Sequence, residues 1–104
     1  ALSTLVMIAL LLALLHGAET AKPSLDFAEA QAGNMVLSLR FSPDGTMLVT
    51  GDEYGTISVW SAIPLREIES ASTDSSAVIS VNFSPDGSSI VAGYMSGTIQ
   101  VWSA

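Results

Sequence analysis

Hydrophobic residues follow two different patterns along this chain. From Leu5 to Leu15 they form one unbroken run, and no charged residue precedes Glu19. From Val36 onward the apolar positions come in short stretches, separated by turns rich in glycine, proline and aspartate. The first pattern is typical of an apolar helix and the second of β-strands joined by tight turns. We therefore treat residues 1–21 apart from the rest.

Residues 1–21 are predicted to form a hydrophobic helix that directs export. A helix needs about 20 apolar residues to cross a bilayer core, and this run is shorter, which favours the apolar region of a signal peptide. A retained membrane anchor through residues 1–18 is the main alternative, and a buried core helix is a third. The two leading interpretations predict an exported protein, periplasmic or extracellular, or a membrane-anchored one.

Residues 22–35 follow as a linker or an outer strand. Leu25 and Phe27 alternate with Ser24 and Asp26, and this two-residue period is compatible with a short strand.

The chain from Val36 onward contains an internal repeat of 42 residues. Displaced by that number, Phe-Ser-Pro-Asp-Gly at 41–45 falls on the same five residues at 83–87, and Val-Trp-Ser-Ala at 59–62 falls on residues 101–104. Sixteen of 28 aligned positions are identical. Such identity is far above chance, so residues 36–76 and 77–104 are two copies of one unit.

Each copy is predicted to form short antiparallel strands in succession. Pro and Gly in Ser-Pro-Asp-Gly favour a tight reversal after the first strand. The fold class is therefore all-β, with one four-stranded unit and a second, incomplete unit that lacks its fourth strand. The predicted strands are 36–41, 47–51, 56–60 and 65–68 in the first copy, with a polar connection at 70–76, and 78–83, 89–93 and 98–102 in the second.

This motif order resembles the WD-repeat family of β-propellers, through Phe-Ser-Pro-Asp-Gly and then Gly-Thr-Ile-x-Val-Trp in both copies. The resemblance implies four-stranded propeller blades. Three family features are missing: the Gly-His pair before the first strand, the turn aspartate, replaced by Tyr54 and Ser96, and the aspartate after the tryptophan, replaced by Ser61 and Ser103. The departures imply that the family's buried His, Asp and Trp network is absent.

Two copies are too few for a closed propeller, which needs about four to eight blades. We expect the sequence to be a fragment of a longer protein. The alternative is a short chain that completes its ring by self-assembly, with Leu25–Ala28 in the outer-strand position.

The charge argues against nucleic acid as a partner. Ten acidic residues oppose three basic ones, giving a net charge of −7, and Lys22, Arg40 and Arg66 are scattered. The absence of cysteine excludes disulfides and thiol chemistry.

The chain offers no recognisable catalytic, cofactor or metal site. The single histidine, His16, lies in the apolar segment, so no Ser-His-Asp arrangement is available. Asp44 and Asp86 occupy equivalent turns and are interpreted as turn residues. Asp52 and Glu53 are adjacent, but calcium takes about six to eight oxygens and the second copy has no acidic residue there. We therefore expect no enzyme.

Trp60 and Trp102 occupy the same place in each copy and are predicted to pack between blades. Binding residues are instead sought where the copies differ. In a propeller the turn between the second and third strands opens on the same face as the connection between blades. The predicted protein-binding residues are Asp52, Glu53, Tyr54, Asp74, Tyr94 and Met95. Substitution of Tyr54 or Tyr94 by alanine is expected to weaken the binding of a partner protein without changing the thermal stability.

The leading functional hypothesis is a noncatalytic protein-interaction or scaffold module that binds protein partners or further blades. The alternatives are part of a propeller enzyme whose active site lies in other blades, and a small membrane-anchored subunit of a larger complex.

Overall fold

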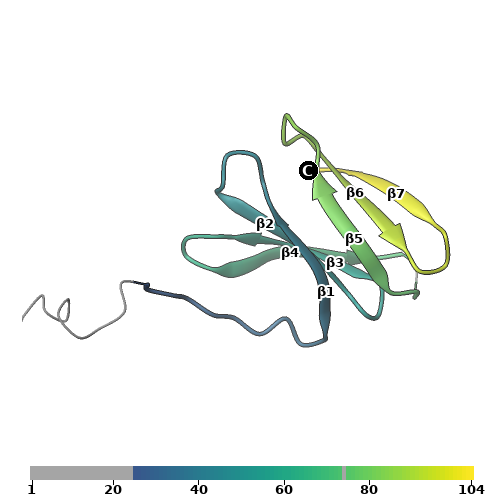
Figure 1. The fold of residues 1–104 in the computed structure, drawn as a ribbon, viewed down its shortest axis with the longest axis horizontal. Helices are drawn as coiled ribbons and strands as arrows, with labels where there is room; N and C mark the ends of the chain where they lie inside the picture. The colour runs from purple at the N-terminus through teal and green to yellow at the C-terminus, as the bar shows by residue number, and fades with distance from the viewer. Residues whose placement is uncertain (1–24, 74) are drawn as a thin grey trace, which may run out of the picture.

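The computed structural model describes residues 25–73 and 75–104, which form two antiparallel β-sheets packed against each other (Figure 1). All regular secondary structure in these residues is β, which confirms the predicted class. The first sheet has the order β1 (Val36–Phe41), β2 (Met47–Asp52), β3 (Thr56–Ser61) and β4 (Arg66–Ser72). The second has the order β5 (Val78–Phe83), β6 (Ser89–Tyr94) and β7 (Ile99–Ser103).

The fourth strand is longer than predicted, and for the segment before the first strand, predicted as a linker or an outer strand, the described residues contain no strand. β4 continues to Ser72, so three of the seven residues in the polar stretch 70–76 that was predicted as a connection lie in a strand. Its serines pair with β3, for example Ser70 with Ser58, because an edge strand tolerates polar side chains on exposed faces. No strand forms between residues 25 and 35, where Leu25 and Phe27 are 83% and 85% exposed. The described residues 25–35 therefore form no strand that would bury these two side chains against a sheet.

The Ser-Pro-Asp-Gly turns that end β1 and β5 are nearly identical, as the repeat predicts. In the first, the Ser42 hydroxyl donates to Asp44 Oδ1 at 2.8 Å and accepts from the Met47 amide at 3.0 Å. The Gly45 amide donates to the Ser42 carbonyl, and its φ of 77° lies where glycine carries no steric cost. Each turn therefore closes through its own polar groups and fixes the register of the hairpin that follows.

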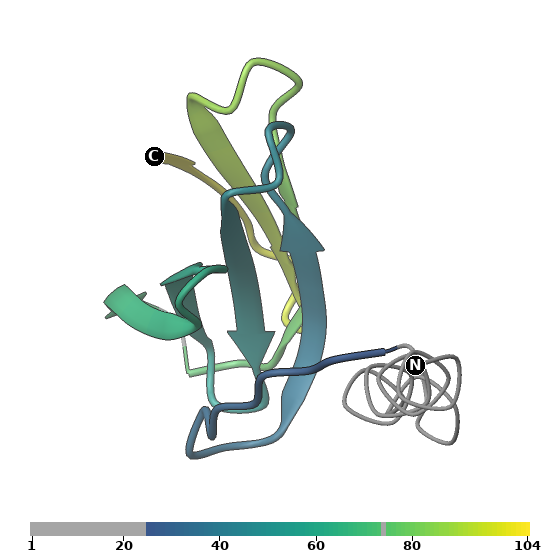
Figure 2. The same cartoon turned by 90° about the vertical axis from the view of Figure 1, so that its left-hand side faces the viewer.

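The core lies between the two sheets, with β5 against β1 and β2 (Figures 1 and 2). Val49, Val78 and Val81 are at most 1% exposed. Gly51 permits this contact, because a Cβ there would lie 2.7 Å from Val78 Cβ and 3.1 Å from Val81 Cγ1. The remaining buried members of this cluster are Ile57, Phe83, Ile90, Ala92 and Tyr94.

One hydrogen bond also joins the two sheets directly. The Val81 amide of β5 donates to Ser38 Oγ of β1 at 3.1 Å. It lies beside register shifts in both sheets, between Val36 and Ser38 and between Val78 and Ser80. β1 and β5, the first strands of the two sheets, are thus joined by a polar contact as well as by apolar packing.

The two tryptophans have different surroundings. Trp60 is 6% exposed and its indole N–H donates to Thr50 Oγ1 at 3.0 Å. Trp102 is half-buried and packs against the core between the sheets. The predicted inter-blade role therefore holds for Trp102, whereas Trp60 is buried without belonging to that cluster.

The predicted N-terminal helix, and with it the signal-peptide and membrane-anchor interpretations, lies outside the described residues. Among residues 25–73 and 75–104 there is no helix long and apolar enough to cross a membrane.

Candidate functional site

Three connecting segments meet at one edge of the molecule, which we call the turn edge: residues 53–55, the described residues 73 and 75–77, and residues 95–98. The Ser72 hydroxyl of the first sheet donates to the Gly55 carbonyl at 3.4 Å. The Ser96 amide donates to Ser76 Oγ, and the Met95 amide to the Ala77 carbonyl, both at 2.9 Å. The segments lie at the lower right of Figure 1. The turns and the connection between the blades thus lie on the same side of the molecule, as expected from the sequence.

Asp52, the last residue of β2 before the turn edge, has a structural role and is not a surface group. It is 7% exposed, and its Oδ1 accepts the amides of Tyr54 and Thr56, each at 2.9 Å. Its second oxygen, Oδ2, accepts a hydrogen bond from Asn34 at 3.4 Å. Its carboxylate therefore caps the β2–β3 turn and also holds Asn34 of the segment before β1, so the side chain is occupied within this chain and little of it is exposed to a partner.

Tyr94 is also buried, at 3% exposure, and belongs to the core. Its hydroxyl donates to Gln100 Oε1 at 2.7 Å, an oxygen that also accepts the Trp102 indole N–H at 3.1 Å. The Gln100 amide donates to Thr73 Oγ1, which joins β7 to the connection from the first sheet. The burial and hydrogen bond of Tyr94 argue against the expectation that its removal leaves stability unchanged.

Sequence reasoning missed two residues of this network, Thr73 of the turn edge and Gln100 of β7. The available signal was that residue 100 is glutamine where the first copy has Ser58. The longer glutamine side chain has two polar atoms: Oε1 accepts from both Tyr94 and Trp102, while the amide nitrogen donates to Thr73.

Three of the predicted contact residues present accessible side chains at the turn edge. Tyr54 and Met95 are 61% and 70% exposed, and Glu53 is half-buried. The sixth predicted residue, Asp74, lies outside the described residues. The turn edge therefore offers an aromatic, a thioether and a carboxylate side chain to a partner.

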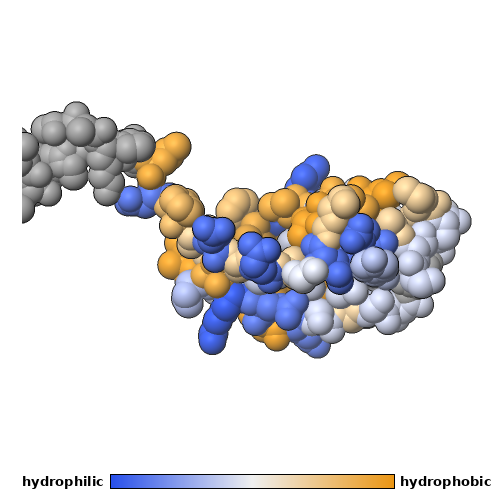
Figure 3. Space-filling model, turned by 90° about the horizontal axis from the view of Figure 1, so that it is seen from below, coloured by the Kyte–Doolittle hydropathy of each residue, from blue (hydrophilic) through white to orange (hydrophobic). Residues whose placement is uncertain are grey.

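No lysine or arginine occurs in residues 51–57, 72–78 or 93–98. Of the basic residues in the described chain, Arg40 lies on β1 and Arg66 at the start of β4, away from the turn edge. Figure 3, which views the molecule of Figure 1 from below, shows hydrophilic and hydrophobic side chains next to each other on this side. The electrostatics of this edge favour a cationic partner over an anionic one.

The carboxylates of the two Ser-Pro-Asp-Gly turns lie elsewhere and serve the backbone. The Thr46 amide, followed by the Ser42 and Thr46 hydroxyls, lowers the pKa of Asp44. The Ser84 hydroxyl, followed by the amide and hydroxyl of Ser88, lowers the pKa of Asp86 to about 2. Both groups are held as anions by their own turns, which suits a structural carboxylate and not a proton donor.

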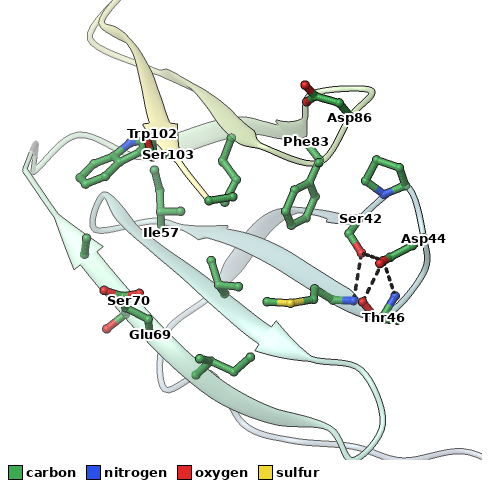
Figure 4. A pocket seen from close by; sticks show the side chains of 18 residues that line it. Ser42, Asp44, Thr46, Ile57, Glu69, Ser70, Phe83, Asp86, Trp102 and Ser103 are labelled. Carbon is green, nitrogen blue, oxygen red and sulfur yellow. Dashed lines mark hydrogen bonds between the residues drawn. The ribbon is translucent and has the colours of Figure 1, made fainter.

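A groove of about 430 Å³ opens between the sheets, beside β7 (Figure 4). Ile57 and Ile68 of the first sheet and Phe83 and Trp102 of the second contribute to its apolar walls. The first sheet has β4 paired along β3, whereas no described strand pairs along the corresponding side of β7. The groove is therefore the space beside an unpaired strand edge, and its lining contains no histidine, lysine or arginine.

The sequence pattern of the family described as "WD domain, G-beta repeat" matches residues 24–61 and 64–103. These matches cover most of the chain, so it belongs to this family, and its two sheets are β-propeller blades of the WD-repeat kind. No curated protein matches the chain.

Two solved structures illustrate the shared fold. One, titled "Structure of U3-55K", superposes with a TM-score of 0.67 at 22% identity, over 72% of this chain and 25% of that one. Another, titled "Crystal structure of RRP9 WD40 repeats", gives a TM-score of 0.66 at 22% identity, over 72% and 24%. This chain thus spans about a quarter of the length of either structure.

Proposed function

We propose that this chain is a noncatalytic protein-interaction module, and that the turn edge is where it binds a protein partner. The family to which it belongs consists generally of scaffolds, and the described residues contain no group of three or more histidine, cysteine or acidic side chains that could hold a metal ion. The observation that carries the proposal is the pair of exposed side chains, Tyr54 and Met95, held on turns whose backbone is fixed by hydrogen bonds.

These two side chains have the properties of contact residues in protein interfaces. Tyrosine and methionine are enriched at such interfaces, because tyrosine adds a large surface at low entropic cost and methionine adapts its shape. Glu53 adds a negative charge beside them. The partner that suits this edge is a protein segment with an apolar side chain and a lysine or arginine.

Site-specific photocrosslinking tests this proposal. A benzoylphenylalanine is placed at Tyr54, at Met95, or at Ile63, which is 92% exposed on the β3–β4 connection at the opposite end of the sheet. We expect the first two positions to label one and the same protein in the source cells, and the third not to label it. The double substitution Tyr54→Ala with Met95→Ser should remove that protein from the purified complex, whereas Ile63→Ser should not. Equal labelling from all three positions would contradict the proposal.

We propose further that the protein is exported or membrane-anchored. The support is the apolar run Leu5–Leu15, which has the length of a signal-peptide core. Cell fractionation with N-terminal sequencing tests this, with a cleaved N-terminus near residue 21 in the exported fraction as the expected result. Retention in carbonate-washed membranes would favour the anchor, and recovery in the cytosol would contradict both.

A further inference from the structure

The turns between the second and third strands are held in different ways in the two blades. In the first blade, Asp52 Oδ1 accepts the amides of Tyr54 and Thr56, so a carboxylate of the preceding strand closes the turn. The residue at the same place in the second blade is Tyr94, whose side chain is buried in the core. The turn at residues 95–98, which we call the Met95 turn, therefore has no carboxylate at this position.

A hydroxyl of the connection between the blades takes the place of that carboxylate. The Ser96 amide donates to Ser76 Oγ at 2.9 Å, and the Met95 amide donates to the Ala77 carbonyl at 2.9 Å. The two acceptors lie three and four residues after Thr73, on the connection from β4 to β5. The position of the Met95 turn thus depends on the position of this connection.

Gln100 of β7 holds the connection at Thr73. Its amide nitrogen donates to Thr73 Oγ1. Its Oε1 accepts the Tyr94 hydroxyl at 2.7 Å and the Trp102 indole N–H at 3.1 Å. Because an indole N–H only donates, the atom facing Trp102 must be the oxygen of the Gln100 amide. The amide nitrogen is thereby directed towards Thr73, and contacts within the second blade fix the orientation of the side chain.

These contacts lead from the core to the turn edge. Tyr94 is 3% exposed, and Trp102 packs against the same core cluster. Gln100 is half-buried, whereas Thr73 and Met95 are exposed. The hydrogen bonds of Gln100 therefore attach an exposed connection to side chains that are fixed in the interior.

We propose that Gln100 is a positioning residue of the turn edge, which acts through Thr73 on the connection and on the Met95 turn. Its effect on partner binding rests on the proposed function, because it requires that Met95 contacts the partner. Its effect on the Met95 turn does not, and a measurement without any partner tests it.

Two substitutions detach the connection from β7. Thr73→Val removes the acceptor on the connection and leaves Tyr94 and Trp102 with theirs. Gln100→Met keeps an unbranched side chain and removes all three hydrogen bonds. Ser75→Val is the matched control, because it makes a similar change at an exposed residue of the same connection.

Amide hydrogen exchange of the full chain, followed by NMR with detergent present to keep residues 1–21 in solution, gives the test. In Thr73→Val and Gln100→Met, the amides of Met95 and Ser96 should exchange about threefold to tenfold faster, the factor that corresponds to one lost hydrogen bond. The Tyr54 amide, which Asp52 holds in the other blade, should keep its rate in Thr73→Val.

Two further comparisons show whether Gln100 acts through Thr73. Combining Thr73→Val with Gln100→Met should accelerate the Met95 and Ser96 amides no more than Gln100→Met alone, because both substitutions remove the same contact. Ser75→Val should leave these rates unchanged.

Three results would overturn the proposal. Unchanged exchange of Met95 and Ser96 in Thr73→Val would show that the connection does not hold this turn. Equal acceleration of Tyr54 in that variant would assign the effect to a loss of overall stability. Additive acceleration in the combined variant would show that Gln100 and Thr73 act separately.

The effect on binding is measured with benzoylphenylalanine at position 95 or 54 in the Thr73→Val chain. We expect the yield of labelled partner from position 95 to fall relative to the yield from position 54. An unchanged ratio would contradict a role of Gln100 in binding. If the unmodified chain labels no protein from either position, the proposed function fails, whereas the exchange rates still decide whether Gln100 positions the turn.

Discussion

The indole N–H of Trp60 donates to Thr50 Oγ1 at 3.0 Å, across the paired strands β2 and β3. Trp60 is 6% exposed, so its only polar atom depends on this partner. The second blade has alanine at the corresponding residue, Ala92, and there Trp102 bonds to Gln100 instead. The two blades therefore provide different hydrogen-bond acceptors for the indole N–H of equivalent tryptophans.

Replacing Thr50 with valine should destabilise the chain. The substitution keeps the shape and removes the acceptor, which leaves a buried N–H unpaired at a cost of about 1–3 kcal/mol. Urea unfolding followed by tryptophan fluorescence measures the change. Thr50→Ser keeps the hydroxyl and should lose less stability than the valine variant. Equal losses for the two variants would show that the hydrogen bond is unimportant.

Tyr94 and Tyr54 should respond very differently to alanine. Tyr94 is 3% exposed, and removal of a large buried aromatic costs about 3–5 kcal/mol. Tyr54 is 61% exposed, and its substitution should change stability by no more than about 0.5 kcal/mol. Thermal unfolding of both variants provides the comparison. A stability loss at Tyr54 as large as that at Tyr94 would mean that Tyr54 is part of the packing and not of an accessible surface.

Gly51 and Gly93 form a matched pair for testing the contact between blades. Gly51→Ala introduces a Cβ that overlaps Val78, and such overpacking costs about 1–3 kcal/mol. Gly93→Ala adds the same methyl group in open space and should leave the unfolding midpoint unchanged or slightly raised. Chemical denaturation of the two variants distinguishes them, and a neutral Gly51→Ala would show that the blades do not pack as closely as described.

Stability should fall in acid because of Asp86. The pKa of this carboxyl is lowered from 3.8 to about 2 by the Ser84 hydroxyl and the amide and hydroxyl of Ser88. A lowered pKa means that the unfolded chain binds the proton more tightly, so this contribution is complete above pH 3.8 and is lost as the pH falls towards 2. Asp44, whose pKa is lowered in the same way, should add to the effect.

The variant Asp86→Asn lacks this titrating group and should show a shallower loss of stability over that pH range. Unfolding midpoints measured at several pH values from 5 to about 2 test this. An unchanged slope in the variant would contradict the assigned role of the carboxylate.

The fold was predictable because the two copies contain the same packing residues and the same turn residues. Two copies of Ser-Pro-Asp-Gly fixed the first hairpin of each blade, and Val-Trp at the same offset fixed the third strand. The extent of β4 was not predictable, since Ser70 and Ser72 have little strand preference and pair only because β3 lies beside them.

Three of the six predicted contact residues, Glu53, Tyr54 and Met95, have accessible side chains at the turn edge, whereas Asp52 and Tyr94 are buried. Turns that differ between the copies indicated the turn edge, yet Asp52 and Tyr94 differ because they have two different buried roles. Asp52 accepts amides of its own turn, whereas Tyr94 packs in the core and bonds to Gln100. A residue that differs between the two copies has a different environment in each. Only its burial in the structure shows whether the side chain faces solvent or packs within its own blade.

The two Ser-Pro-Asp-Gly turns also bear on how the chain folds. Their hydrogen bonds join residues two to five apart, so they form without any distant part of the chain. Hairpins of this kind form in about 1–10 μs. The polypeptide therefore contains two independent starting points for folding, and the contact between Gly51 and Val78 follows as a later, longer-range event.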